Sequence, residues 1–280
     1  MKTSELIRTR RSVRTFDGRS VEPDILEKIL QYAKNADNPY GIPVEWKILN
    51  AKTDSVSSPV IVGTDTFIAG KMKRVPHAEE AFGYSFEKVV LYALSLGIGT
   101  TWIAGTMPRS AFEEAMKLGD DEVLPCMSPL GYIAAKMSVR ETMMRAGIKA
   151  DTRSDFSALF FDGSFDKPLS PDKAGELRLP LELVRLSPSA VNKQPWRIVV
   201  DGDKVHFYEK RSKGYVADGW DVQKIDMGIA MCHFVCGLEK IHSKAELIVS
   251  EPGIVCPAET SHIATFAVRK DTETAVQDAN

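Results

Sequence analysis

The sequence lacks a long apolar run, an excess of one charge and a recognisable leader segment. No apolar stretch reaches the roughly 18 residues that a membrane-spanning helix needs, so we expect no contact with a membrane. The formal net charge of -2 gives no electrostatic reason to expect a nucleic-acid partner. No basic segment followed by an apolar core and a cleavage site opens the chain, and we therefore expect a cytoplasmic protein.

Cysteine is also scarce, with four in 280 residues, and none of the four forms a CxxC pair. Cys232, His233 and Cys236 lie close together, and the two cysteines share one face of a predicted helix. A zinc site would need more ligands at suitable spacing. We therefore expect reduced thiols that pack as small apolar groups, and no metal site.

The residues that are present are those of an ordinary globular protein, with 44% apolar and 26% charged side chains. Their periodicity predicts an α+β fold with antiparallel strands and long helices. Residues 66–82 are expected to be irregular, and residues 136–157 to form a polar connection. Helices are expected over residues 23–34, 82–96, 110–118, 179–186 and 226–242, and strands over 44–49, 59–63, 100–103, 127–134, 197–200, 203–210, 245–249 and 263–268.

Two stretches of the chain repeat one pattern. Residues 25–49 and 179–200 each run from a helix through a proline-containing loop to a tryptophan and a strand, with Trp46 and Trp196 in matching places. Each stretch is followed by one long apolar helix. This indicates an internal duplication, with halves at residues 1–160 and 161–280, although two such units could also arise by chance.

The first string with chemical content is the basic segment Arg10–Phe16. Three guanidiniums within five residues repel one another unless an anion lies between them. Arginine offers planar, forked donors suited to phosphate or to an anionic ring, and Ser12 adds a hydroxyl. The alternative is a solvated basic turn.

The second string is Ser187–Trp196, in which two prolines stiffen the backbone and small residues allow close approach to a ligand. Asn192 and Gln194 carry donors and acceptors. Such a loop could follow the edge of a cofactor, or it could be a structural turn that holds Trp196 in the core.

The third string is Leu96–Thr106. Gly97 and Gly99 are explained by the end of a helix. The Gly-x-Gly lacks a preceding strand and a third glycine, so it is not a dinucleotide-binding fingerprint. Gly105 and Thr106 follow the predicted strand and are expected to offer backbone N–H groups in a loop.

Together these strings resemble the FMN-binding nitroreductase family. Residues 10–14 resemble its Arg-Arg-Ser-x-Arg motif, residues 188–196 its Pro-Ser-x-x-Asn-x-Gln-Pro-Trp motif, and residues 96–105 its Leu-Gly-x-Gly-Thr-x-Trp-x-Gly stretch. One departure is informative: the expected place of the second motif, residues 38–46, matches poorly, and the good copy comes about 150 residues later. The chain therefore resembles a fused, pseudo-dimeric branch, in which one polypeptide acts as a monomer with one FMN.

The resemblance implies a role for individual residues. Arg10 and Ser12 would bind the FMN phosphate together with Arg153 or, as second choice, Arg145. Arg14 would face N1 and O2 of the flavin, where a fixed cation favours the reduced anion. Contacts to the ribityl chain and the ring are expected from Arg11 and, in the other half, from Pro188, Ser189 and Asn192. The N–H groups of Gly105 or Thr106 would meet N5.

No side chain in these strings is an obvious acid, base or nucleophile, which agrees with a cofactor that carries the chemistry. The resemblance implies an FMN-dependent oxidoreductase that takes hydride from NADH or NADPH and reduces nitroaromatics, quinones or related small acceptors. Residues 64–82 and 212–225 are candidates for the acceptor pocket. The alternatives are a non-catalytic flavin-binding or sensing protein, and a flavin-free basic surface for an anionic partner.

Overall fold

A computed structural model describes residues 2–217 and 220–271 of the chain. The chain divides into two compact units. The first holds Thr9–Asp151, and the second holds Lys2–Arg8 and the chain from Thr152 onward. Among the described residues, no helix combines the length and the apolar character that crossing a membrane requires.

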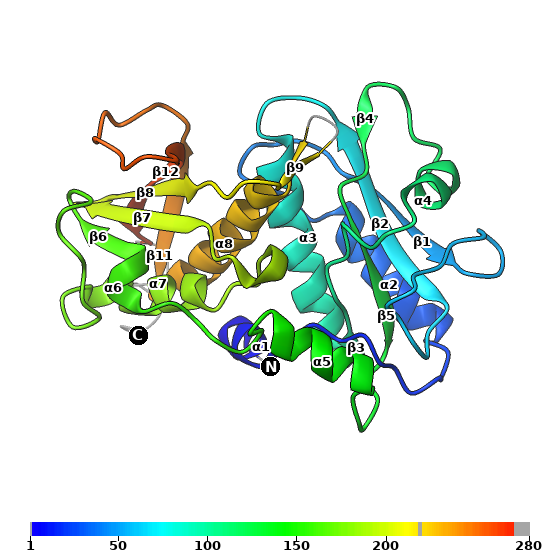
Figure 1. Ribbon diagram of the computed structural model, residues 1–280. Coiled ribbons are helices and arrows are strands. Elements are labelled where there is room, and N and C mark those ends of the chain that lie inside the picture. The colour runs from blue at the N-terminus through cyan, green and yellow to red at the C-terminus, as the bar shows by residue number, and fades with distance from the viewer. Residues whose placement is uncertain (1, 218–219, 272–280) are drawn as a thin grey trace, which may run out of the picture. The chain divides into compact units, whose positions relative to one another are not determined.

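The first unit is built on an antiparallel sheet with strand order β1-β2-β5-β3, and the short strand β4 pairs with β2 (Figure 1). The long helix α3 follows β2 in the chain and contacts both β2 and β3. The elements of this unit are α2 (Pro23–Lys34), β1 (Glu45–Asn50), β2 (Thr66–Lys73), α3 (Ala78–Ser95), β3 (Ile98–Gly99), α4 (Arg109–Ala115), β4 (Glu122–Val123), β5 (Met127–Tyr132) and α5 (Val139–Gly147).

Both faces of this sheet are covered, which explains why β2 is buried along almost its whole length. On one face Trp46 packs against the rings of Phe82 and Phe86 in α3. Gly70 makes room for that indole, since a Cβ there would lie 2.5 Å from the Trp46 ring. On the other face Phe67 meets Phe112 of α4 edge-on, with ring centroids 5.6 Å apart.

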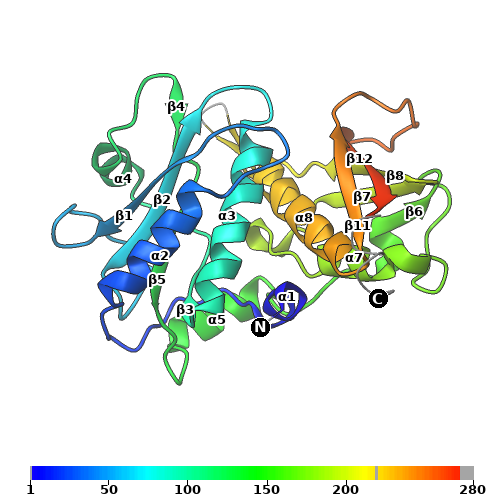
Figure 2. The same ribbon diagram turned by 180° about the vertical axis from the view of Figure 1, so that it is seen from behind.

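The second unit has a five-stranded sheet with strand order β11-β12-β8-β7-β6, in which only the β6–β7 pair is parallel. Figure 2 shows the long helix α8 and the short helix α7 of this unit from behind. Its elements are α1 (Thr3–Thr9), α6 (Phe156–Leu159), β6 (Phe160–Asp162), η1 (Gly175–Leu177), α7 (Arg178–Arg185), η2 (Ala190–Asn192), β7 (Trp196–Asp201), β8 (Lys204–Lys210), β9 (Val216–Ala217), β10 (Trp220–Asp221), α8 (Val222–Glu239), β11 (Ser243–Ile248) and β12 (Thr260–Lys270).

The core of the second unit lies between α8 and the sheet. Phe234 of α8 packs against Phe207 and Phe266, with ring centroids 5.4 Å and 5.7 Å away. α7 packs against α8 so closely that a Cβ at Gly237 would lie 2.5 Å from the Cα of Pro180. A glycine at this point of α8 therefore sets the distance between the two helices.

The two units share one topology. In chain order, α2, β1, β2, α3, β3 and β5 of the first correspond to α7, β7, β8, α8, β11 and β12 of the second. The strand orders β1-β2-β5-β3 and β7-β8-β12-β11 are then the same, and a buried tryptophan lies at the start of β1 and of β7. The chain thus has the predicted α+β fold, with two related halves, mainly antiparallel sheets and long central helices.

Several boundaries predicted from the sequence are wrong. Residues 66–73, expected to be irregular, form the central strand β2. The strand can bury Lys71 because the ammonium of this residue pairs with Glu122 at 2.9 Å. Residues 59–63 form no strand beyond one bridge between Val62 and Thr15, since Pro59 has no N–H and Gly63 has a φ of +85°.

Further differences lie in the second part of the first unit. The strand expected at residues 100–103 is displaced to Ile98–Gly99, with a single bridge at Ile103. The helix expected over residues 110–118 is Arg109–Ala115, with Pro108 at its N-cap position. The polar connection expected at residues 136–157 contains the helix α5. The predicted duplication, with halves at residues 1–160 and 161–280, remains a prediction.

Gly237→Ala tests the contact between α7 and α8. In an exposed helix this change stabilises by up to about 1 kcal/mol. Here the new methyl group meets backbone atoms of Pro180, so we expect a loss of about 1–3 kcal/mol. Thermal or denaturant unfolding measures the change. The control is Gly147→Ala at the end of α5, where a Cβ meets nothing within 4 Å. Equal stability of the two variants would contradict the close packing.

Candidate functional site

The basic segment is held in an extended course across the first unit by its backbone. The N–H of Val13 donates to Thr100 at 2.9 Å, and the N–H of Val62 donates to the carbonyl of Arg14 at 3.0 Å. The ring of Phe16 fills the space over Gly131, where a Cβ would lie 2.7 Å from it. Because the backbone is fixed on both sides, the arginine side chains project from defined positions.

Helix α5 is attached to the same segment through its first turn. Ser138 caps the helix by accepting the N–H of Glu141, and its own N–H donates to the hydroxyl of Thr15 at 3.1 Å. The Glu141 side chain is fully buried. It accepts the backbone N–H of Arg14 at 3.2 Å and lies 3.4 Å from Nη1 of Arg11. Glu141 thus compensates the charge of this arginine string from within the protein.

The Arg10 guanidinium is the most unusual group of the segment. Its side chain is 6% exposed, and neither Nε nor Nη1 has a hydrogen-bond acceptor among the described residues. The nearest carboxylate, Glu87 of α3, lies 4.0 Å from Nε, which is too far for a hydrogen bond. Burial lowers the pKa of Arg10, Glu87 raises it, and the neighbouring Arg145 lowers it. Arginine nevertheless stays charged in proteins, so two cationic N–H donors are buried here and unsatisfied.

Two further groups beside Arg10 also lack hydrogen-bond partners among the described residues. Neither the Arg14 guanidinium nor the Ser12 hydroxyl forms a hydrogen bond with a described residue. Burial lowers the pKa of Arg14, Glu141 raises it, and Arg145 lowers it. Arg145 itself reaches the carbonyl of Ser12 at 3.5 Å and pairs with the exposed Asp151. The structure therefore brings Arg10, Ser12, Arg14 and Arg145 together as a set of donors that suits an anion.

The loop after β3 offers backbone donors. Ile103 is fixed to Met127 by two backbone hydrogen bonds, of 2.9 Å and 3.0 Å. Gly105 and Thr106 follow in an exposed turn, and their N–H groups donate to no acceptor within the part of the chain that the structure describes. No steric contact requires a glycine at position 105, since a Cβ there would meet nothing within 4 Å. The loop is thus free to take a ligand acceptor.

In the second unit, the proline-containing loop is strained and tightly held. Val191, Asn192 and Gln194 have φ values of 50°, 56° and 50°, in the left-handed region that such residues rarely adopt. The N–H of Ala190 lies 3.1 Å from both carboxylate oxygens of the buried Asp226 in α8. Backbone strain maintained by a buried anchor is typical of functional loops, although it does not identify a ligand.

The same loop brings together two of the predicted site residues. Asn192 donates to the carbonyl of Thr152 at 3.1 Å, and its Oδ1 lies 3.5 Å from Nη1 of Arg153. Ser189 accepts the N–H of Gln194 at 2.9 Å. Asn192 and Ser189 therefore shape the loop itself, and the contacts of Pro188, Ser189, Asn192 and Arg153 with a flavin remain predictions.

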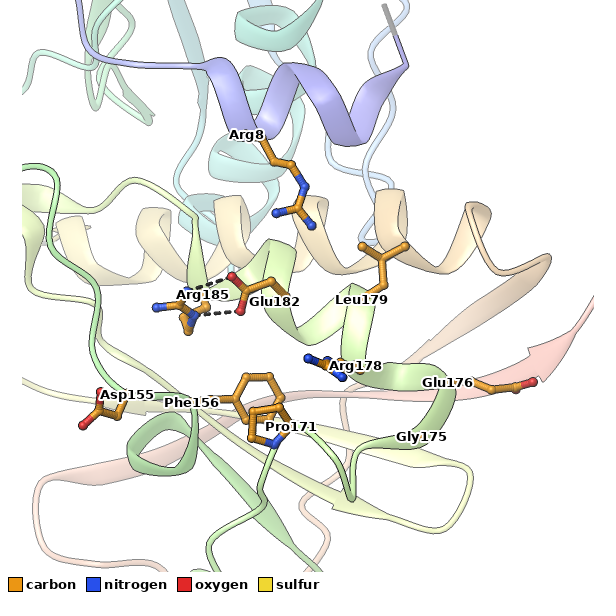
Figure 3. Close-up of a pocket in the computed structure, with 10 residues that line it drawn as sticks. All are labelled: Arg8, Asp155, Phe156, Pro171, Gly175, Glu176, Arg178, Leu179, Glu182 and Arg185. Atoms are coloured by element: carbon orange, nitrogen blue, oxygen red, sulfur yellow. Dashed lines mark hydrogen bonds and ion pairs between the residues drawn. The ribbon is translucent and has the colours of Figure 1, made fainter.

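The structure also has a pocket of about 680 Å³ in the second unit, between α1 and α7 (Figure 3). Most of the charged side chains that line it form ion pairs. Arg185 donates two hydrogen bonds of 2.7 Å to the carboxylate of Glu182. None of the residues predicted for the flavin site lines it. The predicted pocket segment at residues 64–82 is largely buried strand and helix. Within residues 212–225, positions 218 and 219 lie outside the described residues.

Sequence reasoning missed three buried carboxylates that organise these sites, those of Glu87, Glu141 and Asp226. A signal existed for each. Glu87 and Asp226 interrupt long apolar helices, where a charge must find a partner. Glu141 stands three residues after Ser138, the spacing of a capping box.

Asp226→Asn tests the anchor of the second loop. Burial raises the pKa of Asp226 well above its usual range, with the Ala190 N–H acting against this and the carboxylates of Asp221 and Glu209 adding to it. The carboxyl group of Asp226 then binds its proton more tightly in the folded protein than in the unfolded chain. Stability from this group is therefore full below about pH 4 and is lost as pH rises through the raised pKa.

Asparagine can still accept the Ala190 N–H but cannot ionise, so we expect Asp226→Asn to be the more stable protein at neutral pH and to lose that advantage in acid. Thermal unfolding of both proteins between about pH 4 and pH 8 measures this. Asp166→Asn, at an exposed position, is the control. Parallel curves for wild type and Asp226→Asn would contradict the buried, protonatable anchor.

Comparison with known proteins identifies the family to which this chain is similar. A family model described as "Putative TM nitroreductase" matches residues 2–238. A crystal structure from Thermotoga maritima, described as a "putative nitroreductase", matches with 19% identity and a TM-score of 0.63, over 95% of this chain and 94% of its own. No curated protein matches the sequence.

Two other solved structures match about half of this chain. An "FMN-dependent Nitroreductase" from Clostridium difficile has 19% identity and a TM-score of 0.41, over 48% of this chain and 88% of its own. An "FMN and NADPH-dependent nitroreductase" from Sphigopyxis sp. strain HMH has 15% identity and a TM-score of 0.41, over 50% and 92%. Because the family model spans most of the sequence and the Thermotoga structure shares the fold over nearly all of it, this chain belongs to the nitroreductase family.

Proposed function

We propose that this protein is an FMN-dependent oxidoreductase that takes hydride from NADH or NADPH and reduces a nitroaromatic, a quinone or a related small acceptor. The observation that carries the proposal is the Arg10 guanidinium, which is buried with Nε and Nη1 unsatisfied among the described residues. A buried charged donor without an acceptor is costly, and a bound phosphate relieves that cost.

The donors around Arg10 match the chemistry of a phosphate dianion. Arg10 supplies charged N–H groups, Ser12 a hydroxyl, and Arg145 a second guanidinium at the carbonyl of Ser12. Arg145 can turn from the exposed Asp151 to a ligand at little cost, because that ion pair is solvated on one side. Within the first unit, Arg145 is therefore the better-supported third phosphate ligand, and Arg153 is proposed to act beside Asn192.

Bound FMN would supply hydride transfer at N5 of its isoalloxazine ring. The residues of the protein would orient the isoalloxazine ring and polarise it. We assign Arg14 to the N1 and O2 side of the ring, where its fixed charge stabilises negative charge. The N–H groups of Gly105 and Thr106 are assigned to N5 and Arg11 to the ribityl chain. Pro188, Ser189 and Asn192 are assigned to the ring and the ribityl chain, as the sequence resemblance implies. In this proposal a single cytoplasmic chain supplies the whole site.

Two measurements on the purified protein test this function. The first is FMN titration, in which bound flavin loses fluorescence and comigrates with the protein. The second is anaerobic addition of NADH or NADPH, which should bleach the flavin absorbance until a quinone or nitroaromatic restores it. Flavin that binds but is never bleached would favour a non-catalytic flavin protein. Protein that ignores FMN would contradict the proposal and favour a basic surface for another anion.

Arg10→Gln tests the proposed phosphate contact. Hydrogen bonds to charged groups contribute about 1.5–3 kcal/mol, so we expect FMN affinity to fall about 10- to 100-fold. Affinity for riboflavin, which has no phosphate, should change less than about threefold. Fluorescence titration measures both. The control is Arg19→Gln, since Arg19 is exposed and pairs with Asp17. An equal loss for both flavins would show that Arg10 does not select the phosphate.

A further inference from the structure

Glu87 is a buried carboxylate at an unusual distance from its counter-ion. Its side chain has no exposed surface, and Oε1 lies 4.0 Å from Nε of Arg10. A charged hydrogen bond between such groups normally closes to about 2.7–2.9 Å. Glu87 therefore compensates the charge of Arg10 while leaving the Nε and Nη1 donors of that guanidinium unused.

Trp102 binds the other oxygen of this carboxylate. Its indole Nε1 donates to Oε2 of Glu87 at 3.1 Å. The indole is held in turn by the ring of Phe86, with centroids 4.7 Å apart in an edge-on arrangement. Glu87 and Phe86 are neighbours on α3, so the helix and the indole fix the carboxylate from two directions. Trp102 belongs to the third sequence string, and the proposed flavin contacts give this residue no other role.

We propose that Glu87, held back by Trp102, is a positioning residue that compensates the charge of the buried Arg10 while leaving Nε and Nη1 available for the phosphate of the ligand. The inference rests on the proposed flavin function. It predicts that Glu87 and the phosphate compete for one guanidinium. A carboxylate that moved toward Arg10 would satisfy the donors and exclude the phosphate, and a neutral side chain would leave the guanidinium dependent on the ligand.

Two substitutions in this cluster should shift FMN affinity in opposite directions. Glu87→Gln keeps an oxygen for the Trp102 N–H and removes the competing charge. We expect FMN affinity to rise about tenfold, or about 1.4 kcal/mol. Trp102→Phe keeps the charge and removes the N–H that holds it, so the carboxylate can close on Arg10. For this variant we expect FMN affinity to fall about tenfold.

Riboflavin separates this effect from general damage to the fold. Neither variant should change riboflavin affinity by more than about threefold, because riboflavin has no phosphate for Arg10. Fluorescence titrations of wild type and both variants, with FMN and with riboflavin, make the comparison. Thermal unfolding without ligand adds a second readout: Glu87→Gln should melt lower than wild type, and inorganic phosphate should raise its melting temperature more than that of wild type.

The outcomes distinguish this inference from the proposed function. Opposite shifts for FMN with unchanged riboflavin affinity support it. Weaker binding of both flavins by both variants assigns Glu87 and Trp102 a structural role and overturns it. Wild-type FMN binding that neither substitution changes also overturns it, while the proposed function stands. If wild type binds no FMN, the proposed function fails, and the inference fails with it.

Discussion

The most demanding feature of the first unit is a buried guanidinium, that of Arg10, which has two N–H donors that no described residue accepts. Arg10 is almost enclosed, and Nε and Nη1 find no acceptor among the described residues. Folding alone would favour either exposing such a group or pairing it fully. The fold instead fixes the Arg10–Phe16 backbone across the sheet and places Glu87 and Glu141 as buried counter-charges. In the proposed function, the phosphate of FMN completes this arrangement.

The two halves share one topology but differ in the loops that their central helices anchor. Each runs helix, two strands, long buried helix and two strands, with the same order in the sheet. In the second half, Asp226 of the central helix holds the proline-containing loop. At the matching place in the first half, Asn38 caps its own loop and donates to Ser85 of the central helix. The anchoring to the central helix is thus retained while the loop residues differ.

Sequence reasoning was strongest where one physical rule acted alone. Apolar periodicity located α3 and α8, and the Asp-Gly-Asp turn located the hairpin of β7 and β8. It was wrong where two rules opposed each other. Residues 66–82 were expected to be irregular, although tertiary pairing with Glu122 allows Lys71 to be buried within the strand β2. The arginine string predicted an anion site, and that remains a prediction. Its internal counter-ions, Glu87 and Glu141, come from residues far away in the sequence, which no local pattern reveals.

The most direct test of this account is a crystal structure of the protein with FMN bound. We expect phosphate oxygens about 2.7–2.9 Å from Nε or Nη1 of Arg10, with Glu87 still bonded to the Trp102 indole. A flavin phosphate bound away from Arg10, with the guanidinium turned to a protein acceptor instead, would contradict it.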